Sequence, residues 1–116
     1  MKNLLVILRK PPYGTVDAAE AVRHAGGAGG FDYKATLYMI DGGVYAGKKN
    51  QNAGDTGFSG LGESLELLSD EMEIYVCRNS LNECGIDEED LVEGIKIDDG
   101  EALKHALKNA NSVMIF

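Results

Sequence analysis

Apolar residues recur along the chain with two different spacings. Short continuous apolar runs, typical of strands buried in a parallel sheet, alternate with segments in which apolar residues return every three or four positions, as in helices. The predicted strands are 4–8, 33–40, 73–77, 95–97 and 112–116. The predicted helices are 16–25, 60–69, 78–83 and a last one after Asp99, whose apolar stripe is Leu103, Ala106, Leu107 and Ala110.

This alternation predicts the fold class. Strands and helices in turn imply right-handed crossovers and a mostly parallel five-stranded sheet with helices on both faces, a three-layer α/β/α sandwich. The 116 residues suit a single domain over 1–116, with no repeat or linker. Thr15 and Asp99 are predicted N-caps, and Gly85 is expected to end the third helix. Residues 26–30 are expected to form a loop, and 41–59 an irregular segment.

Charge narrows the possible partners. The net charge is −8, and it lies in residues 83–101, where nine acids accompany Lys96 alone. Nucleic acid and anionic membranes require a basic face, so neither is an expected partner. The run 87–90 is read as a solvated face, with a docking patch for a basic protein as the alternative. The longest apolar run, 4–8, is too short for a membrane helix or a signal peptide, and a cytoplasmic protein is expected.

The carboxyl edge of the predicted sheet is where a ligand would bind. Three segments reach it, 11–15, 41–49 and 77–79. The first joins a strand to a helix, so its backbone amides could hold an anion, but it has no Walker lysine. The glycines at 26–30 lack the dinucleotide spacing and follow a helix, and the cysteines and histidines lack zinc-site spacing. No cofactor and no metal are therefore expected.

Cys77 is the most informative single residue. It ends a strand and begins a helix, where the helix dipole and neighbouring Arg78 favour a nucleophilic thiolate. The alternative is a buried packing cysteine, and the sequence position leaves both open. Cys84 lies seven residues on, about 10 Å along a helix, which argues against a disulfide between the two. Packing at a helix end is the preferred interpretation of Cys84 over a resolving role.

Four stretches in the same order resemble the DsrE/TusD-like sulfur-relay family. They are Lys10-Pro11-Pro12-Tyr13-Gly14-Thr15, Asp41-Gly42-Gly43-Val44-Tyr45, Ile74-Tyr75-Val76-Cys77 with Gly85-Ile86 beyond it, and the segment from Asp98 to Phe116. The resemblance runs nearly from end to end. One departure is that Glu83 and Cys84 stand where the family often has basic residues.

The resemblance implies a DsrE-like α/β subunit that assembles into homo-trimers or homo-hexamers, with or without paralogous subunits. It implies that Cys77 carries sulfane sulfur as a persulfide, received from a donor protein and passed to an acceptor protein. The positions expected to line the site are Tyr13, Gly14, Thr15, Gly43, Tyr45, Arg78 and Asn79.

Two other functions compete with this sulfurtransferase-type carrier. One is a non-enzymatic oligomeric module that binds a small ligand or anion at the 13–15 loop, with Cys77 structural. The other is a flavodoxin-like electron carrier, which suits the fold and the acidity. The chain contains no Trp to flank a flavin and no hydroxyl-rich phosphate loop, so the electron carrier is the weaker alternative.

Overall fold

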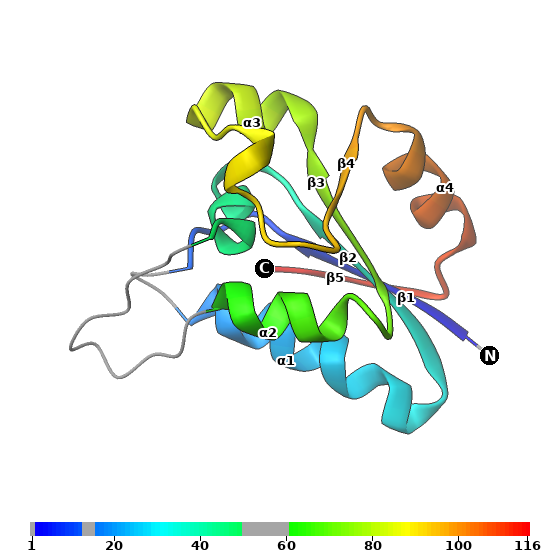
Figure 1. The fold of residues 1–116 in the computed structure, drawn as a ribbon. Helices are drawn as coiled ribbons and strands as arrows, with labels where there is room; N and C mark the ends of the chain where they lie inside the picture. Colours follow the sequence, from blue (N-terminus) through cyan, green and yellow to red (C-terminus); the bar gives the residue numbers. More distant parts are fainter. Residues whose placement is uncertain (1, 13–15, 50–60) are drawn as a thin grey trace.

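The computed structural model describes residues 2–12, 16–49 and 61–116, which form a five-stranded sheet with helices on both faces (Figure 1). The strands are β1 (Lys2–Leu8), β2 (Tyr33–Met39), β3 (Glu73–Cys77), β4 (Lys96–Asp98) and β5 (Ser112–Ile115). The α-helices are α1 (Asp17–Gly27), α2 (Leu61–Leu68), α3 (Arg78–Cys84) and α4 (Glu101–Asn109). Short 3₁₀ helices are η1 (Ala28–Phe31), η2 (Asp41–Gly47) and η4 (Glu88–Asp90).

The sheet has the strand order β4-β3-β2-β1-β5, and each neighbouring pair is parallel. The chain moves from β1 outward to β4 and then returns to the other side of β1. Helices α1 and α2 cover one face, and α4 crosses the other on its way from the β4 edge to the β5 edge (Figure 1). The predicted parallel α/β architecture is confirmed. In the described ranges, no helix is long and apolar enough to cross a membrane.

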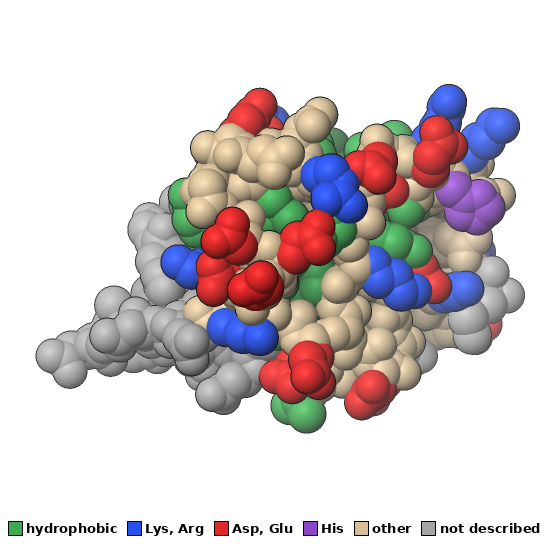
Figure 2. Space-filling model, turned by 45° about the horizontal axis from the view of Figure 1, so that its top comes forward, with side chains coloured by type: hydrophobic (Ala, Val, Ile, Leu, Met, Phe, Trp, Pro, Cys, Tyr) green, Lys and Arg blue, Asp and Glu red, His purple; other side chains and the backbone are tan. Residues whose placement is uncertain are grey.

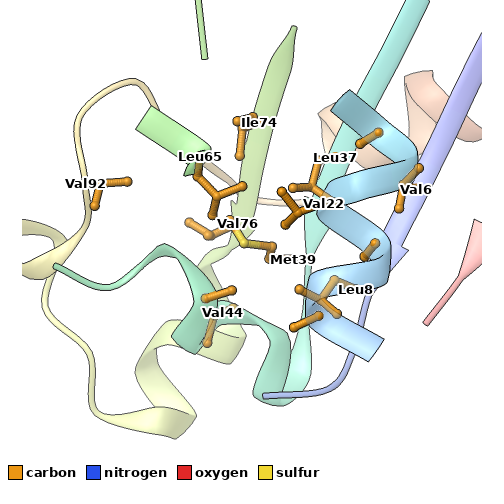
Figure 3. Close-up of a cluster of buried hydrophobic side chains, with 14 of the residues drawn as sticks. Val6, Leu8, Val22, Leu37, Met39, Val44, Leu65, Ile74, Val76 and Val92 are labelled. Carbon is orange, nitrogen blue, oxygen red and sulfur yellow. The ribbon is translucent and has the colours of Figure 1, made fainter. Parts of the chain in front are cut away.

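The face under α1 and α2 holds the main core. Alternate strand residues point to it, because successive side chains of a strand face opposite ways. These side chains pack with Val22 of α1, Leu65 of α2 and Val44 of η2 (Figure 3). Val6, Leu8, Leu37, Met39, Ile74 and Val76 are the fully buried strand members. Their burial explains why every second residue of these strands is apolar.

The opposite face is more polar. In register from one edge of the sheet to the other, its central row is Lys96, Tyr75, Tyr38, Ile7 and Ile115. Tyr38 is fully buried, whereas Ile115 at the β5 edge is 63% exposed. This is the face crossed by α4, in which no residue is buried. Of the predicted apolar stripe, Leu103 and Ala106 are half-buried, Leu107 is 49% exposed, and Ala110 lies just beyond the end of the helix.

Three local predictions were wrong. Gly26 and Gly27 belong to α1 and are followed by η1, so the glycine cluster is helical rather than a loop. Strand β4 lies one residue later than expected. The carboxylate that accepts hydrogen bonds from the start of α4 is that of Asp98, not Asp99. The predicted cap Thr15 lies outside the described residues, and Gly85 ends α3 in the left-handed conformation, as predicted.

Gly43 should tolerate no side chain. A Cβ at this position would lie 2.1 Å from the carbonyl oxygen of Leu8, a backbone atom that cannot move aside. We expect Gly43→Ala to cost about 1–3 kcal/mol of unfolding free energy, measured by urea denaturation. Gly27→Ala is the matched control, because its Cβ would meet nothing within 4 Å. The control should gain about 0.4–1 kcal/mol, and equal effects at both positions would contradict this account.

Candidate functional site

The segments that follow β1, β2 and β3 meet at the carboxyl edge of the sheet. The backbone N–H of Asp41, at the start of η2, donates to the hydroxyl of Ser80 in α3 at 2.8 Å. The Asp41 carboxylate pairs with Arg9, which follows β1, at 3.2 Å. Asp41 also has a positive φ of 53°, so these contacts hold it in a conformation that is uncommon outside glycine. These contacts join η2 to Arg9 and to α3 at this edge, whereas residues 13–15 of the first predicted segment lie outside the described residues.

Cys77 stands at this edge as the last residue of β3 and the residue before α3. It is a free, half-buried cysteine, and its side chain makes no capping hydrogen bond to the helix. In the parallel pairing of β3 with β4 it is the partner of Asp98. Its side chain therefore belongs to the same face of the sheet as Asp98 and Tyr38.

Asp98 is a buried carboxylate at the centre of a hydrogen-bond network. It is 6% exposed, and it accepts a hydrogen bond from the hydroxyl of Tyr38 at 2.7 Å. It also accepts from the backbone N–H groups of Ala102 at 2.9 Å and Leu103 at 3.2 Å. Burial acts to raise the pKa of Asp98, but these hydrogen bonds outweigh it and hold the pKa below its ordinary value. The network joins β2, β4 and the first turn of α4.

Tyr38 reaches from β2 across β3, the strand of Cys77, to this carboxylate on β4. Burial, the hydrogen bond to Asp98 and the negative charge of that carboxylate raise the pKa of Tyr38, and the charge of an ionised Cys77 contributes in the same direction. Tyr38 thus remains a neutral hydroxyl that donates to Asp98. Its ring lies 6.3 Å from that of Tyr75, centroid to centroid, so two tyrosines form the floor of the face beside Cys77.

Arg78 follows Cys77 directly, but its guanidinium forms ion pairs with two carboxylates. Its Nε donates to Asp99 at 2.6 Å, and another guanidinium nitrogen donates to Glu88 of η4 at 2.8 Å. The hydrogen bonds to Glu88 and Asp99 raise the pKa of Arg78. Sequence reasoning assigned this guanidinium to the Cys77 thiolate. In the structure, its hydrogen bonds tie α3 to η4 and to the turn after β4.

A second group of side chains gathers at the far end of α3. The hydroxyl of Tyr45 donates to the backbone carbonyl of Cys84 at 3.2 Å, and the Cys84 thiol lies 3.8 Å from the carbonyl oxygen of Asp41. The charge and hydrogen bonding of Cys84 raise the pKa of Tyr45, with a smaller effect of burial. The hydroxyl of Tyr45 is thus bonded at the last residue of α3, whereas Cys77 precedes the first residue of that helix.

The other residues that were expected to line the site differ in exposure, and three of them lie outside the described residues. Gly43 is buried against β1, and Asn79 is exposed in the first turn of α3. Tyr13, Gly14 and Thr15 lie outside the described residues. Sequence reasoning missed Tyr38 and Asp98. Counting every second residue back from Cys77 and across the paired strands would have placed both on its face.

Carboxylates surround this end of the molecule. Figure 2 shows Asp and Glu side chains gathered over it, with Lys and Arg between them and apolar surface in the middle. Glu83, Glu88, Glu89 and Asp99 are among the exposed acids of the elements there. Within the described ranges, no three His, Cys, Asp or Glu side chains are grouped as metal ligands would be. The site thus contains the thiol of Cys77, the buried carboxylate of Asp98 and the hydroxyl of Tyr38.

Comparison with known proteins identifies the family. The model of the DsrE/DsrF-like family matches residues 2–116. The chain belongs to this family. The crystal structure of the ychN protein from E. coli superposes with a TM-score of 0.87 over 100% of both chains at 21% identity, which shows the shared fold.

Similar sequences in the family carry sulfur-related names. The chain is 33% identical over 95 residues to the intracellular sulfur oxidation protein DsrF of Allochromatium vinosum, covering 80% of this chain and 70% of that protein. It is 28% identical over 115 residues to a TusC homolog of Pseudomonas aeruginosa, covering 97% of each. An uncharacterized protein of Methanocaldococcus jannaschii is 31% identical over 115 residues and 96% of each chain.

Asp98 should stabilise the fold in a pH-dependent way. Because its folded pKa is lowered, its contribution is complete above the unfolded pKa of about 3.9 and is lost as the pH falls through the folded value. We expect Asp98→Asn to lose about 1.5–3 kcal/mol at pH 7, the range for hydrogen bonds to a charged group. Urea denaturation should show this difference shrinking towards pH 3.

The exposed carboxylate of Glu93 gives the control for that experiment. Glu93→Gln should change the unfolding free energy by no more than about 0.5 kcal/mol. If Asp98→Asn were as stable as the parent at pH 7, or if its deficit were the same at pH 3, the network around Asp98 would not have the role described.

Proposed function

We propose that the protein is a sulfur-relay component that carries sulfane sulfur on Cys77 as a persulfide. The observation that carries the proposal is a free cysteine at the carboxyl edge of the sheet whose thiol makes no capping hydrogen bond. Membership of the DsrE/DsrF-like family, with a relative named for intracellular sulfur oxidation, supports sulfur as the cargo.

The transfer consists of two thiol exchange steps. The Cys77 thiolate attacks the outer sulfur of a donor persulfide, R–S–SH. A new S–S bond forms at Cys77, the donor S–S bond breaks, and the donor leaves as R–S⁻. An acceptor thiolate then attacks the outer sulfur of Cys77–S–SH and releases the Cys77 thiolate, so that there is no net oxidation. Such exchange depends on thiolate character and access rather than on a metal or a general acid.

The neighbours of Cys77 suit this chemistry. Beside the thiol, the Tyr38 hydroxyl donates to Asp98, and Asp98 also accepts from the backbone N–H of Ala102. The double ion pair of Arg78 fixes the start of α3. The side chains around Cys77 thus provide a rigid frame, and the visiting donor or acceptor supplies the second sulfur.

The proposal includes its partners. The donor and the acceptor are proteins that present a persulfide or a thiol at the carboxyl edge. The protein itself works as an assembly of its own copies, a trimer or a hexamer, with or without paralogous subunits. Full-length matches to a TusC homolog support a subunit of this size and fold.

Loading with polysulfide tests the chemistry directly. Incubation with inorganic polysulfide followed by intact mass measurement should add one sulfur atom to the protein. The gain should persist in Cys84→Ser and vanish in Cys77→Ser, which serve as matched variants because both cysteines are free and half-buried. Absence of any gain, or a gain that depends on Cys84 alone, would overturn the proposal.

The two thiols should also differ in reactivity in the folded protein. The thiol of Cys84 is turned to the Asp41 carbonyl and lies beside Tyr45, whereas that of Cys77 caps no helix amide. Iodoacetamide should therefore modify Cys77 in Cys84→Ser faster than it modifies Cys84 in Cys77→Ser. Timed mass spectra at neutral pH give both rates. Slow labelling of Cys77, at the rate of Cys84 or below, would favour a structural role for it.

A further inference from the structure

A groove separates α4 from the sheet beneath it. It has a volume of about 620 Å³ and is bounded by α4 on one side and by β1, β2 and β3 on the other. A helix packed directly on a sheet buries part of its surface, yet no residue of α4 is buried. On the helix side, the short side chains of Ala102, Ala106 and Ala110 leave the space open. The groove is of ligand-binding size, since such cavities measure about 300–1,000 Å³.

The sheet side of the groove is polar, which a packed core would not require. Glu73 and Tyr75 of β3 line it. The Tyr75 hydroxyl donates to the Glu73 carboxylate, and the Lys96 ammonium lies 3.6 Å from that carboxylate. The hydrogen bond from Tyr75 lowers the pKa of Glu73 despite burial, and the charges of Lys96 and Lys34 act in the same direction. Glu73 is therefore a charged group that the protein itself already compensates.

Three other polar groups in the groove lack such compensation. Within the described ranges, the ammonium of Lys34 and the carboxylate of Glu101 form no ion pair, and the charge of Lys34 acts on Glu73 only at longer range. The hydroxyl of Thr36, a half-buried residue of β2, likewise has no hydrogen-bond partner among the described residues. Half-buried polar groups are satisfied by water or by a ligand. The groove thus offers one cation, one anion and one hydroxyl to a molecule from outside.

The two charges lie at opposite ends of the groove. Glu101 is the first residue of α4. Lys34 is in register with Asn3, whose side-chain amide donates to the backbone carbonyl of Asn109, the last residue of α4, at 3.1 Å. From Glu101 to Asn109 the helix rises about 12 Å.

This span defines the length of the molecule that would fit. An extended peptide covers at most about 3.3–3.6 Å per residue, so three residues cover roughly 10–11 Å. A single amino acid carries both charges but is too short to reach from one end to the other. A tripeptide with free termini has opposite charges at a matching distance.

We propose that the groove under α4 is a binding site for a short peptide of about three residues with free termini. The peptide carboxylate pairs with Lys34, the terminal ammonium pairs with Glu101, and a peptide group between them bonds to the Thr36 hydroxyl. Small side chains of the peptide contact Ala102 and Ala106. Cys77 is not among the residues that line the groove, so this site is additional to the one proposed for sulfur transfer.

Titration with trialanine, followed by amide NMR spectra of the parent protein, tests the proposal. Trialanine should shift the amide signals of β2 and α4 and give a saturable binding curve. N-acetyl-trialanine and trialanine amide each lack one terminal charge, and alanine lacks the length. Each should bind about tenfold more weakly or worse, because a hydrogen-bonded charge is left without its partner.

The peptide series also states what would overturn the proposal. Absence of trialanine binding would do so. Equal binding of the two blocked peptides would do so as well, because it would indicate that the groove takes an internal segment of a protein instead. Alanine binding as tightly as trialanine would contradict the length derived from the two charges.

Variants at the two ends locate the peptide. Lys34→Gln and Glu101→Gln should each weaken trialanine binding about tenfold. Lys104→Gln and Glu66→Gln are the matched controls, because both residues are exposed and neither lines the groove, and they should bind as the parent does. Lys34→Gln should in addition bind trialanine and trialanine amide equally, a result that a folding defect would not produce. Continued discrimination between these two peptides would show that Lys34 does not hold the carboxylate.

Hydrogen exchange provides an independent measurement. A peptide between α4 and the sheet contacts both, so saturation with trialanine should slow the exchange of the α4 amides with solvent deuterium. Alanine at the same concentration is the control. Unchanged exchange at saturation would place the bound peptide elsewhere and overturn the proposal. Because trialanine contains no sulfur, none of these results depends on the chemistry of Cys77.

Discussion

The buried carboxylate of Asp98 is the interaction on which the site depends. A carboxylate out of water is costly unless hydrogen bonds compensate, and here a tyrosine hydroxyl and the first amides of α4 do so. These bonds fix three elements relative to each other, β2 through Tyr38, β4 through Asp98 itself and α4 through its first turn. Because Cys77 is in register with Asp98, the position of the thiol is set by the same contacts.

Much of the fold could be predicted from the spacing of apolar residues. Strands such as β3 are short, apolar and bounded by turn residues, so their type and order were clear, and Gly85 marked the end of α3. The end of α1 could not be predicted in the same way. Gly26 and Gly27 have low helix propensity but remain helical, and a Cβ at Gly26 would lie 3.3 Å from the side chain of Leu68, a tertiary neighbour that no local pattern reveals.

The candidate site was predictable in location but not in its contacts. The carboxyl edge and Cys77 followed from alternation and from one strand end. The partners of Arg78 did not, since Glu88 and Asp99 approach it through turns whose path depends on packing. Likewise the pairing of Tyr38 with Asp98, 60 residues apart, requires knowing that β2 and β4 both flank β3. The family resemblance added the sulfur chemistry, which the contacts alone would not have named.

The weak anchoring of α4 has a consequence for motion. None of its residues is buried, and its first turn is held mainly by polar bonds to Asp98 rather than by packing. A helix with so little apolar burial opens at a lower free energy than the sheet beneath it. We expect its backbone amides to exchange with solvent deuterium through local opening, whereas those of β1 and β2 exchange only through global unfolding. The floor beside the thiol would then be transiently uncovered in the native ensemble, without loss of the sheet.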